Sequence, residues 1–254
     1  PVTAHCGLEK AKSTIETLLR KEKTSVSGER ALQIVEQAGI RIPHYEIAED
    51  LEAAKLIAGK MGYPVVLKVS SPDISHKSDV GAVKVGMRDE KQLEEAYLQI
   101  MINSRRAAPN AVIYGVEVHQ MITGAKEFVV GMNRDPQFGP LIMFGLGGIY
   151  VEIFKDVVFR IAPLSEDDIE AMIFGVKSRK LLTGARGEKP RDIEAVREVL
   201  RVISCLVTEI DCITEMDINP LFVMEEGGGV YSVDARFSLK PDWKSMVYPS
   251  IRRT

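Results

Sequence analysis

The sequence predicts an α+β fold in two lobes, and three observations carry this prediction. Helical and strand-like segments are mixed along the chain without the strict alternation that a parallel βαβ fold requires. The 254 residues are enough for one large domain or two medium ones. The composition, 45% hydrophobic and 27% charged, is that of an ordinary globular protein, so a packed core is expected.

The first quarter of the chain predicts three helices and one strand. Residues 7–23 have their apolar side chains on one side of an amphipathic helix. Residues 27–40 predict a second helix, capped by Ser27 and closed by a glycine. A short strand follows at 44–48, and a third helix at 50–62 ends at a glycine just before a proline.

The rest of the chain alternates runs of strands with helices, and we place the lobe boundary near Thr123 and Gly124, between two strands. Strands are recognised by β-branched and aromatic residues between turn residues, and helices by the longer apolar period. The expected elements are, in chain order, strands at 64–70 and 81–87, a helix at 89–106, strands at 111–122, 127–133, 139–145 and 151–162, helices at 165–175 and 190–208, and strands at 215–224 and 230–237.

Charge and apolar pattern argue against several classes of protein. A net charge of −3 and a pI of about 5.9 do not favour nucleic-acid binding. No apolar run approaches the roughly 18 residues that a membrane span needs. The first residues lack the apolar core of a signal peptide, and the three cysteines show no CxxC spacing. We therefore expect a cytoplasmic protein with reduced thiols and no membrane partner.

The last two strands predict a metal site. Alternation puts Asp217 and Asn219 on one face of the first strand. A hairpin centred in the glycine-rich turn at 225–229 then places Asn219 opposite Asp234 and Asp217 opposite Arg236. Carboxylate and amide oxygens are hard ligands of the kind that Mg²⁺ takes, usually one or two from the protein. The alternative is a surface pair of Asp217 with Arg236 and a turn at Asn219.

Two further signals remain open when they are taken alone. The run "FGLGGIYVE" lacks the third glycine of the dinucleotide motif GxGxxG. It predicts a tight turn with Gly145, Gly147 and Gly148 at positive φ, or a turn whose N–H groups approach an anion. Lys68 lies within an apolar strand and is either an edge-strand device or a phosphate contact. The chain has no P-loop GxxxxGK[ST], so nucleotide binding would use another fold.

A polar loop holds one of the four histidines between two β-rich runs. In "KVSSPDISHKSDVGAVKV", residues 68–85, His76 is surrounded by Pro, Asp, Ser and Lys. The loop is either an ordinary solvated turn or the carrier of a nucleophile. An imidazole is largely neutral near pH 7 and can then attack phosphorus.

Taken together, these segments resemble the ATP-grasp domain of acyl-CoA synthetases that form ADP or GDP, and above all the β-subunits of the ADP-forming acetyl-CoA synthetases. The segments occur in the family's order and the resemblance covers about residues 25 to 240. As an ordered set they are far more specific than any one of them. They are "GYPVVLKVSSPDISHKSDVGAVKVG", "RDPQFGPLIMFGLGGIYVEIFKDVVFRIAPL", "LLTGARG" and "DINPL…VDAR".

The resemblance implies an ATP-grasp fold with the nucleotide held between two β-containing lobes. The expected domains are a short N-terminal helical extension at 1–24, a first lobe at 25–122 with the His76 loop, and a second lobe at 123–254 with the metal site. The ligands implied are ATP or ADP and Mg²⁺.

The resemblance also implies roles for individual residues. Asn219 and Asp234 would hold Mg²⁺, Asp217 would face a phosphohistidine, and His76 would be transiently phosphorylated. The residues expected around the nucleotide are Lys68 at the phosphates, the backbone of Gln120, Met121 and Ile122 at the adenine with Glu117 nearby, and Glu127 and Arg134 near the ribose and phosphates.

The reaction implied is acyl-CoA + ADP + phosphate ⇌ carboxylic acid + CoA + ATP, through an acyl phosphate and phosphohistidine intermediates. The CoA-binding domain and the first active-site histidine belong to an α-subunit, so an α₂β₂ hetero-oligomer is expected. Two alternatives are a succinyl-CoA synthetase β-chain and a degenerate ATP-grasp nucleotide-sensing module. The first has a glycine-rich loop where this chain has His76, and the second often loses the metal ligands or the lysine.

Overall fold

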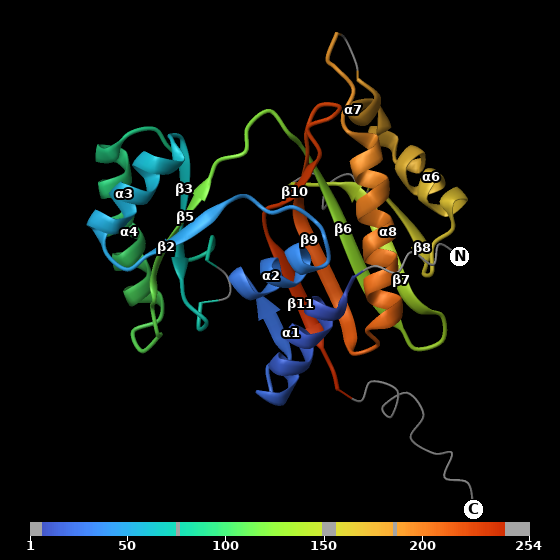
Figure 1. Ribbon diagram of the computed structural model, residues 1–254, viewed down its shortest axis with the longest axis horizontal. Coiled ribbons are helices and arrows are strands. Elements are labelled where there is room, and N and C mark those ends of the chain that lie inside the picture. The colour runs from blue at the N-terminus through green and yellow to red at the C-terminus, as the bar shows by residue number, and fades with distance from the viewer. Residues whose placement is uncertain (1–6, 75–76, 149–155, 185–186, 242–254) are drawn as a thin grey trace, which may run out of the picture. The chain divides into compact units, whose positions relative to one another are not determined.

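The computed structural model describes residues 7–74, 77–148, 156–184 and 187–241, and the chain divides into two compact units. The larger unit combines residues 1–42 with 124–254, and the smaller unit is 43–123. Each unit has its own antiparallel sheet and its own hydrophobic core (Figure 1). Within the described residues, no helix combines the length and the apolar character that a bilayer span demands.

The smaller unit is a four-stranded sheet in the order β2-β5-β3-β4, with two helices on one face. The first helix begins where the carboxylate of Asp50 accepts the N–H of Ala53 at 2.8 Å, and it ends at Gly62, whose φ is 87°. The elements are β2 Tyr45–Ala48, α3 Leu51–Met61, β3 Val65–Ser70, β4 Val83–Met87, α4 Glu90–Ala107 and β5 Gly115–Gln120.

Alternation along these strands separates a core face from an open face. Leu67 on β3 and Val118 on β5 are fully buried against the helices. Their neighbours Lys68 and Glu117 are opposite each other in the register and therefore share the other face. The smaller unit thus directs its charged strand residues away from its hydrophobic core.

The larger unit is built on a seven-stranded sheet in the order β1-β11-β9-β6-β7-β8, with β10 added beside β9. Its strands are β1 Ser25–Ser27, β6 Lys126–Asp135, β7 Gly139–Leu146, β8 Val157–Ile161, β9 Ile213–Val223, β10 Val230–Ser232 and β11 Ala235–Leu239. Its helices are α1 Glu9–Arg20, α2 Glu29–Gln37, α6 Glu166–Gly175, α7 Lys180–Thr183 and α8 Ile193–Glu209, with the 3₁₀ turn η1 at Lys177–Arg179.

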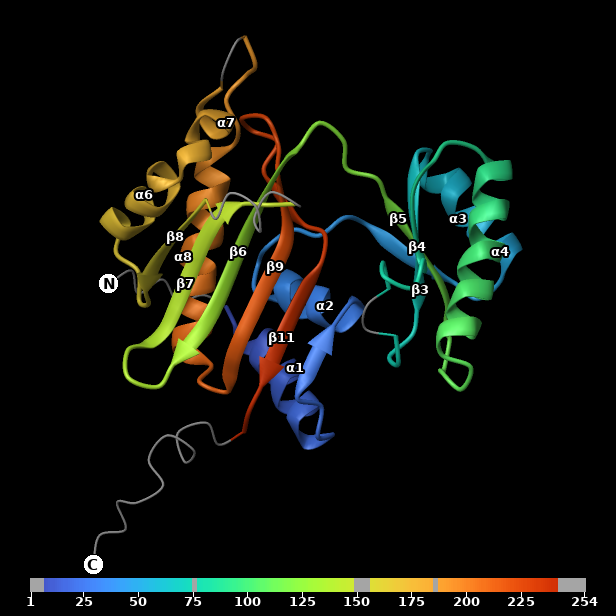
Figure 2. The ribbon, with the colours of Figure 1, turned by 180° about the vertical axis from the view of Figure 1, so that it is seen from behind.

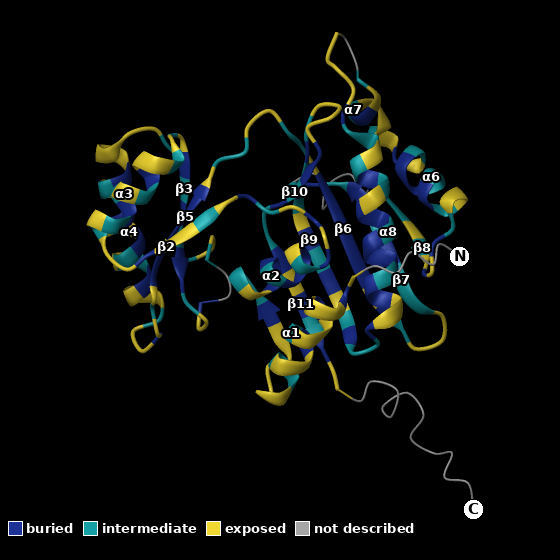
Figure 3. Cartoon of the chain, viewed as in Figure 1, coloured by how far each residue is buried: buried dark blue, intermediate teal, exposed yellow. Residues whose placement is uncertain are grey.

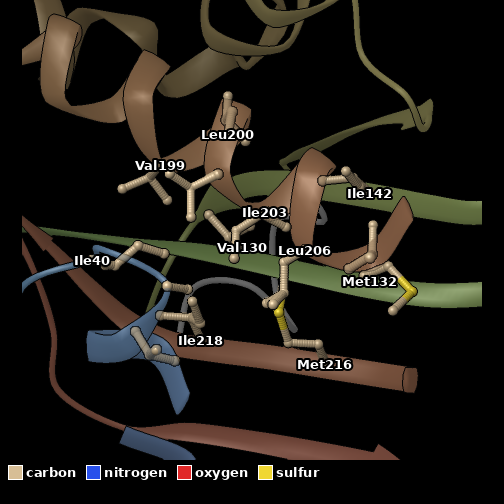
Figure 4. Packing of buried hydrophobic residues seen from close by; sticks show 14 of the residues in the cluster. Ile40, Val130, Met132, Ile142, Val199, Leu200, Ile203, Leu206, Met216 and Ile218 are labelled. Atoms are coloured by element: carbon tan, nitrogen blue, oxygen red, sulfur yellow. The ribbon is translucent and has the colours of Figure 1, made fainter. Parts of the chain in front are cut away.

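Helix α8 covers one face of this sheet. Val199, Ile203 and Leu206 recur at helical spacing and pack on Val130 and Ile218 of the strands (Figure 4). Fully burying one such side chain stabilises the fold by about 1.5–3 kcal/mol. Because this stripe is continuous, the sheet is firmly supported from the helical side.

The other face of the larger sheet is the one seen in Figure 2, where no described helix of this unit lies over it. Along β9 the exposure alternates, so that Ile218 is buried while Asn219 is exposed, and Figure 3 shows the same alternation in colour. This open face carries the polar residues that the closing hairpin was expected to present.

The N-terminal residues correct the expected domain boundaries. Residues 25–42 do not join the first lobe, because β1 pairs with β11 and the buried side chains of α2 belong to the core under α8. Helix α1 packs through Ile15 into the same core, so residues 7–24 are part of the larger unit and not a separate extension. The division between residues 123 and 124 agrees with the expected position.

Two local predictions also need correction. Ser27 does not cap the second helix, because it is the last residue of β1, opposite Arg236. The N-cap residue is Gly28, without a side-chain hydrogen bond. The single strand expected at 230–237 is split into β10 and β11, which interrupts the ladder at Val233 and Asp234.

Candidate active site

The closing hairpin has the register that the sequence predicts. Asp217 of β9 is directly opposite Arg236 of β11, and the next pair along is Ile218 with Ala235. One step further, the N–H of Asn219 donates to the carbonyl of Asp234 at 3.3 Å. The prediction of adjacent cross-strand positions for these residues is therefore confirmed.

Asn219 and Asp234 offer oxygen ligands at the end of this ladder. The Asn219 side chain has no hydrogen bond within the described residues, and only Oδ1 of Asp234 is engaged, by the N–H of Ala235 at 3.0 Å. Within the described part of the chain, no three His, Cys, Asp or Glu side chains form a group that could hold a metal. One carboxylate and one amide oxygen, with other ligands from a phosphate and water, fit the usual coordination of Mg²⁺.

Asp217, two residues before Asn219 on β9, is half-buried. Burial raises the pKa of its carboxyl group and the negative charge of Asp234 adds to the effect, although the charge of Arg236 opposes it. No hydrogen bond or ion pair to Asp217 occurs within the described residues. A desolvated carboxylate without a partner is typical of a functional position.

A pocket of about 410 Å³ opens on the same face, and all of its lining belongs to the larger unit. Asp217 and Arg236 form part of its wall, and Gly131 leaves room beside them. Its polar lining includes Asn133 and Glu215, and its apolar lining includes side chains of β7 and β8. The pocket therefore extends from Asp217 along β9, away from the hairpin turn.

The smaller unit holds a buried charged triad on its open face. One oxygen of Glu117 is 2.9 Å from Nζ of Lys77, and the other is 2.8 Å from Nε2 of His119. Burial works to raise the pKa of Glu117, but the hydrogen bond from His119 and the charge of Lys77 outweigh it and hold the pKa below its ordinary value. Glu117 is therefore an ionised group with two partners.

His119 is kept neutral in this triad. Burial lowers its pKa to about 4, even though Glu117 favours the protonated form. Because an ionised carboxylate only accepts hydrogen bonds, Nε2 of His119 carries the hydrogen. Its ring stacks on Tyr45 with centroids 4.9 Å apart, and its Nδ1 is buried without a partner. These contacts give His119 a structural role in the smaller unit.

Lys68 lies beside this triad. It is opposite Glu117 on β5 and Val83 on β4, so it occupies a central strand and not an edge. Its positive charge contributes to lowering the pKa of His119. The edge-strand interpretation is therefore wrong, and a phosphate contact remains the interpretation that we keep for Lys68.

The residues expected around the adenine follow the end of β5. The N–H of Gln120 donates to the carbonyl of His44 at 2.8 Å, so this N–H is already engaged. Met121 and Ile122 come after the strand and are half-buried. The backbone of Gln120, Met121 and Ile122 therefore stays the prediction for reading a base, with the N–H of Gln120 left out.

Glu127 lies at the start of β6, beside the glycine turn. Its carbonyl accepts the N–H of Gly147 at 2.9 Å. Of the three glycines, Gly148 has the positive φ that was expected, at 70°. Gly145 and Gly147 allow a close approach of the backbone instead. A Cβ at Gly147 would lie 2.6 Å from the carbonyl oxygen of Phe128, and one at Gly145 would collide with the carbonyl oxygen of Asp156.

Arg134 is not placed for a nucleotide. Its side chain is buried on the face of β6 that packs on α8, where Nε donates to the carbonyl of Ile213 at 2.8 Å and the guanidinium also reaches the carbonyls of Val207 and Ile210. It therefore closes the C-terminal end of α8. The expectation that Arg134 lies near the ribose and phosphates is wrong, because alternation along β6 turns its side chain into the core.

His76, the histidine of the polar loop, lies outside the described residues, so its role stays a prediction. Its neighbour Lys77 is described, and the contact of Lys77 with Glu117 was not predicted. For Arg236, only the pairing with Asp217 was predicted. The signal for Arg236 was present in the alternation of the last strand, whereas a contact between Lys77 and Glu117, forty residues apart, had no signal in one sequence.

Comparison with families and curated proteins gives consistent results. A family model described as an ATP-grasp domain matches residues 17–239. The β-subunit of ADP-forming acetate–CoA ligase I from Pyrococcus furiosus is 44% identical over 230 residues, covering 91% of this chain and 98% of that subunit. ADP-forming acetate–CoA ligase I from Archaeoglobus fulgidus is 48% identical over 231 residues. The chain spans 33% of that longer protein's length.

Solved structures show the same relationship. A dinucleotide-forming acetyl-coenzyme A synthetase 1 from Ca. Korarchaeum cryptofilum, in complex with coenzyme A, Ca-AMPCP and HgCl⁺, superimposes with a TM-score of 0.83 at 42% identity. The match covers 91% of this chain and 100% of that one. Another structure of that synthetase, with coenzyme A and Mg-AMPPCP, has a phosphohistidine segment pointing towards the nucleotide binding site.

Proposed function

This chain belongs to the ATP-grasp family, and we propose that it is the nucleotide-binding β-subunit of an ADP-forming acetate–CoA ligase. The family and the ATP-grasp fold expected from the ordered motifs are confirmed. The enzyme class is that of an acid–thiol ligase. The reaction is acyl-CoA + ADP + phosphate ⇌ carboxylic acid + CoA + ATP, of which this chain performs the nucleotide part.

Asn219 and Asp234 hold Mg²⁺ in this proposal. When bound, Mg²⁺ neutralises phosphate charge and orients the nucleotide. Lys68 adds a second positive charge at the phosphates. Because phosphoryl transfer depends mainly on positioning and charge neutralisation, these residues supply most of what the reaction needs from this chain.

His76 is the phosphoryl carrier in this proposal. In the direction of ATP use, the lone pair of one imidazole nitrogen forms an N–P bond with the γ-phosphorus. The P–O bond to the β-phosphate breaks, and its electron pair leaves on ADP. The phosphorylated ring releases the proton of its other nitrogen, and in this proposal Asp217 is the base that accepts it. In the direction of ATP formation the same bonds are made and broken in reverse.

The partner is an α-subunit with the CoA-binding domain and the first active-site histidine, in an α₂β₂ assembly. Relatives of nearly the same length as this chain are described as β-subunits, which supports a partner chain. The longer relative from Archaeoglobus fulgidus is compatible with the same parts joined in one chain.

The observation that carries the proposal is the hairpin register, with Asn219 beside Asp234 and Asp217 in front of them. The test is ATP formation from acetyl-CoA, ADP and phosphate, with and without the purified α-subunit. We expect activity only with both subunits. Incubation with Mg²⁺ and ATP labelled at the γ-phosphate should place acid-labile phosphate on His76.

His76→Ala is the decisive variant, and His44→Ala is its matched control, because the His44 side chain is exposed and, among the described residues, pairs only with Glu46, at 3.5 Å. We expect His76→Ala to abolish labelling and ATP formation, and His44→Ala to leave both unchanged. Full activity of His76→Ala in the reconstituted complex would disprove the carrier role. A chain that binds nucleotide but never supports turnover would favour the sensing module.

A further inference from the structure

Arg236 is the cation of the pocket on the open face of the larger unit. The residues that line this pocket include the carboxylates of Asp217 and Glu215, and Arg236 is the one cationic side chain among its described lining. It is exposed, and it forms no hydrogen bond or ion pair within the described residues. Its guanidinium therefore keeps its donors for another group.

A purely structural role explains this residue poorly. Cross-strand pairs of opposite charge are common and contribute about 0.2–1 kcal/mol. Arg236 is directly opposite Asp217, yet no N–O distance between them falls within 4.0 Å, the limit for an ion pair. Ser27, its neighbour on β1, does not bind it either. The fold therefore holds Arg236 at the pocket without a hydrogen bond or ion pair among the described residues, and its charge acts on Asp217 only at longer range.

Arg236 lies further from the hairpin turn than the proposed metal ligands. Asp234 directly precedes β11, and Arg236 is the second residue of that strand, about 6–7 Å further from the hairpin turn for an extended backbone. Asp217, the residue proposed to face the imidazole, is directly across from it. A phosphoryl group bound in the pocket beside Asp217 would therefore lie at the level of Arg236.

Charge requires a cation at this point. The carboxylates of Glu215, Asp217 and Asp234 all lie on or beside this face, and they repel a phosphoryl dianion. Guanidinium binds phosphate through two parallel hydrogen bonds and is always charged. Without Arg236, the charged side chains among the described lining of this pocket would be the carboxylates of Glu215 and Asp217 alone.

We propose that Arg236 is a catalytic residue. It binds the phosphoryl group on the side of the accepting imidazole, while the group moves between the nucleotide and the imidazole. This inference rests on the proposed phosphoryl transfer and adds a residue to it. The Arg236 guanidinium contacts the phosphoryl group while it is being transferred and after it has been attached to the histidine. It does not contact the adenine, the ribose or the α-phosphate.

The experiment measures the rate at which the full chain takes up label from Mg²⁺ and ATP labelled at the γ-phosphate, alone and with the α-subunit. We expect Arg236→Gln to reduce this rate by about 10- to 100-fold, the loss typical of a charged hydrogen-bonding partner. Arg236→Lys should recover part of the rate, because it keeps the charge but not the planar fork. The affinity for ADP should change by less than about threefold in both variants.

Arg160→Gln is the matched control, since Arg160 lies on β8 of the same sheet and pairs with Asp168 at 3.5 Å. It should keep the wild-type rate. A wild-type rate in Arg236→Gln would overturn the inference, and so would an equal loss of ADP affinity and labelling. If the wild-type chain itself takes up no label and supports no ATP formation, the proposed function fails instead.

Discussion

The two sheets each present a carboxylate on an open face, and the two carboxylates are in opposite situations. In the smaller unit, Glu117 is buried but bonded to Lys77 at 2.9 Å and to His119 at 2.8 Å. In the larger unit, Asp217 is half-buried and has no bonded partner within the described residues. The pKa of Glu117 is consequently lowered, and that of Asp217 is raised.

This difference separates a group that stabilises the fold from one that is available to a ligand. A buried charge with partners supports the packing around it, and removing a partner leaves a costly unpaired charge. A desolvated carboxylate without partners gains its favourable interactions only when something binds. Substitutions in the smaller unit should therefore affect stability first, and substitutions on the hairpin should affect activity first.

The largest expected effect is on activity at the metal ligands. We expect Asp234→Ala to reduce ATP formation by at least about 100-fold in the reconstituted complex, because it removes a charged ligand of Mg²⁺. Its melting temperature should stay close to that of the wild type, since the one hydrogen bond of the Asp234 side chain among the described residues comes from the N–H of Ala235. Asp167→Ala on α6, an exposed position, is the control and should keep full activity. A large loss of stability in Asp234→Ala would contradict the separation of roles.

The next effect is on the stability of the smaller unit. Glu117→Gln should destabilise it by about 3 kcal/mol, because Lys77 is left without a counter-charge in a partly buried position. Hydrogen exchange of the amides of β5 measures this local stability. Adding Lys77→Met should recover part of the loss. Glu46→Gln, on the neighbouring strand and exposed, should change the same exchange by less than about 0.5 kcal/mol.

His119 predicts how the smaller unit responds to acid. Burial lowers the pKa of its imidazole from 6.5 to about 4, so the unfolded chain binds a proton that the folded chain does not. The contribution of His119 to the free energy of unfolding is therefore fully present above about pH 6.5. It is lost as the pH falls towards 4, by up to about 3 kcal/mol. Glu117, whose pKa is also lowered, adds a further loss as it becomes protonated.

Exchange of the β5 amides at pH 7, 6, 5 and 4 tests this pH dependence. His119→Gln should make the profile flatter between pH 6.5 and 4. If the exchange of the wild type and of this variant depends on pH in the same way, another group controls the response to acid.

The smallest expected effect is on the pH dependence of catalysis. Because the charge of Arg236 lowers the pKa of Asp217, Arg236→Gln should raise that pKa further. The acid side of the pH–rate profile should then move up by about half a unit to one unit, in addition to the lower rate. Arg160→Gln should leave the profile in place. An unchanged profile in Arg236→Gln would show that Asp217 does not control this limb.

Part of the candidate site follows from local patterns in the sequence. The pairing of Asp217 with Arg236 depends only on strand alternation and on the position of the glycine-rich turn, and the structure confirms it. The helix that begins at Asp50 and ends at Gly62 follows from its caps in the same way. These features are decided by residues close together in the chain, so one sequence is enough to predict them.

The errors have the opposite origin. Ser27 has the side chain of a helix cap, but pairing with β11 takes it into a strand. Arg134 has the charge of a phosphate-binding residue, but its place on β6 turns it towards the carbonyls at the end of α8. In both cases a partner far along the chain decided the role, and local propensity carries no information about that partner.

By itself, the sequence determined the secondary structure of most segments, the register of the closing hairpin, and the ordered motifs of the ATP-grasp family. Only the tertiary structure decided that residues 25–42 join the larger unit, that Lys77 and His119 share the charge of Glu117, and that Arg236 is left without a bonded partner among the described residues. The physical reason is that caps, alternation and turns are set by near neighbours. Burial and charge pairing, in contrast, depend on which distant segments the folded sheets bring together.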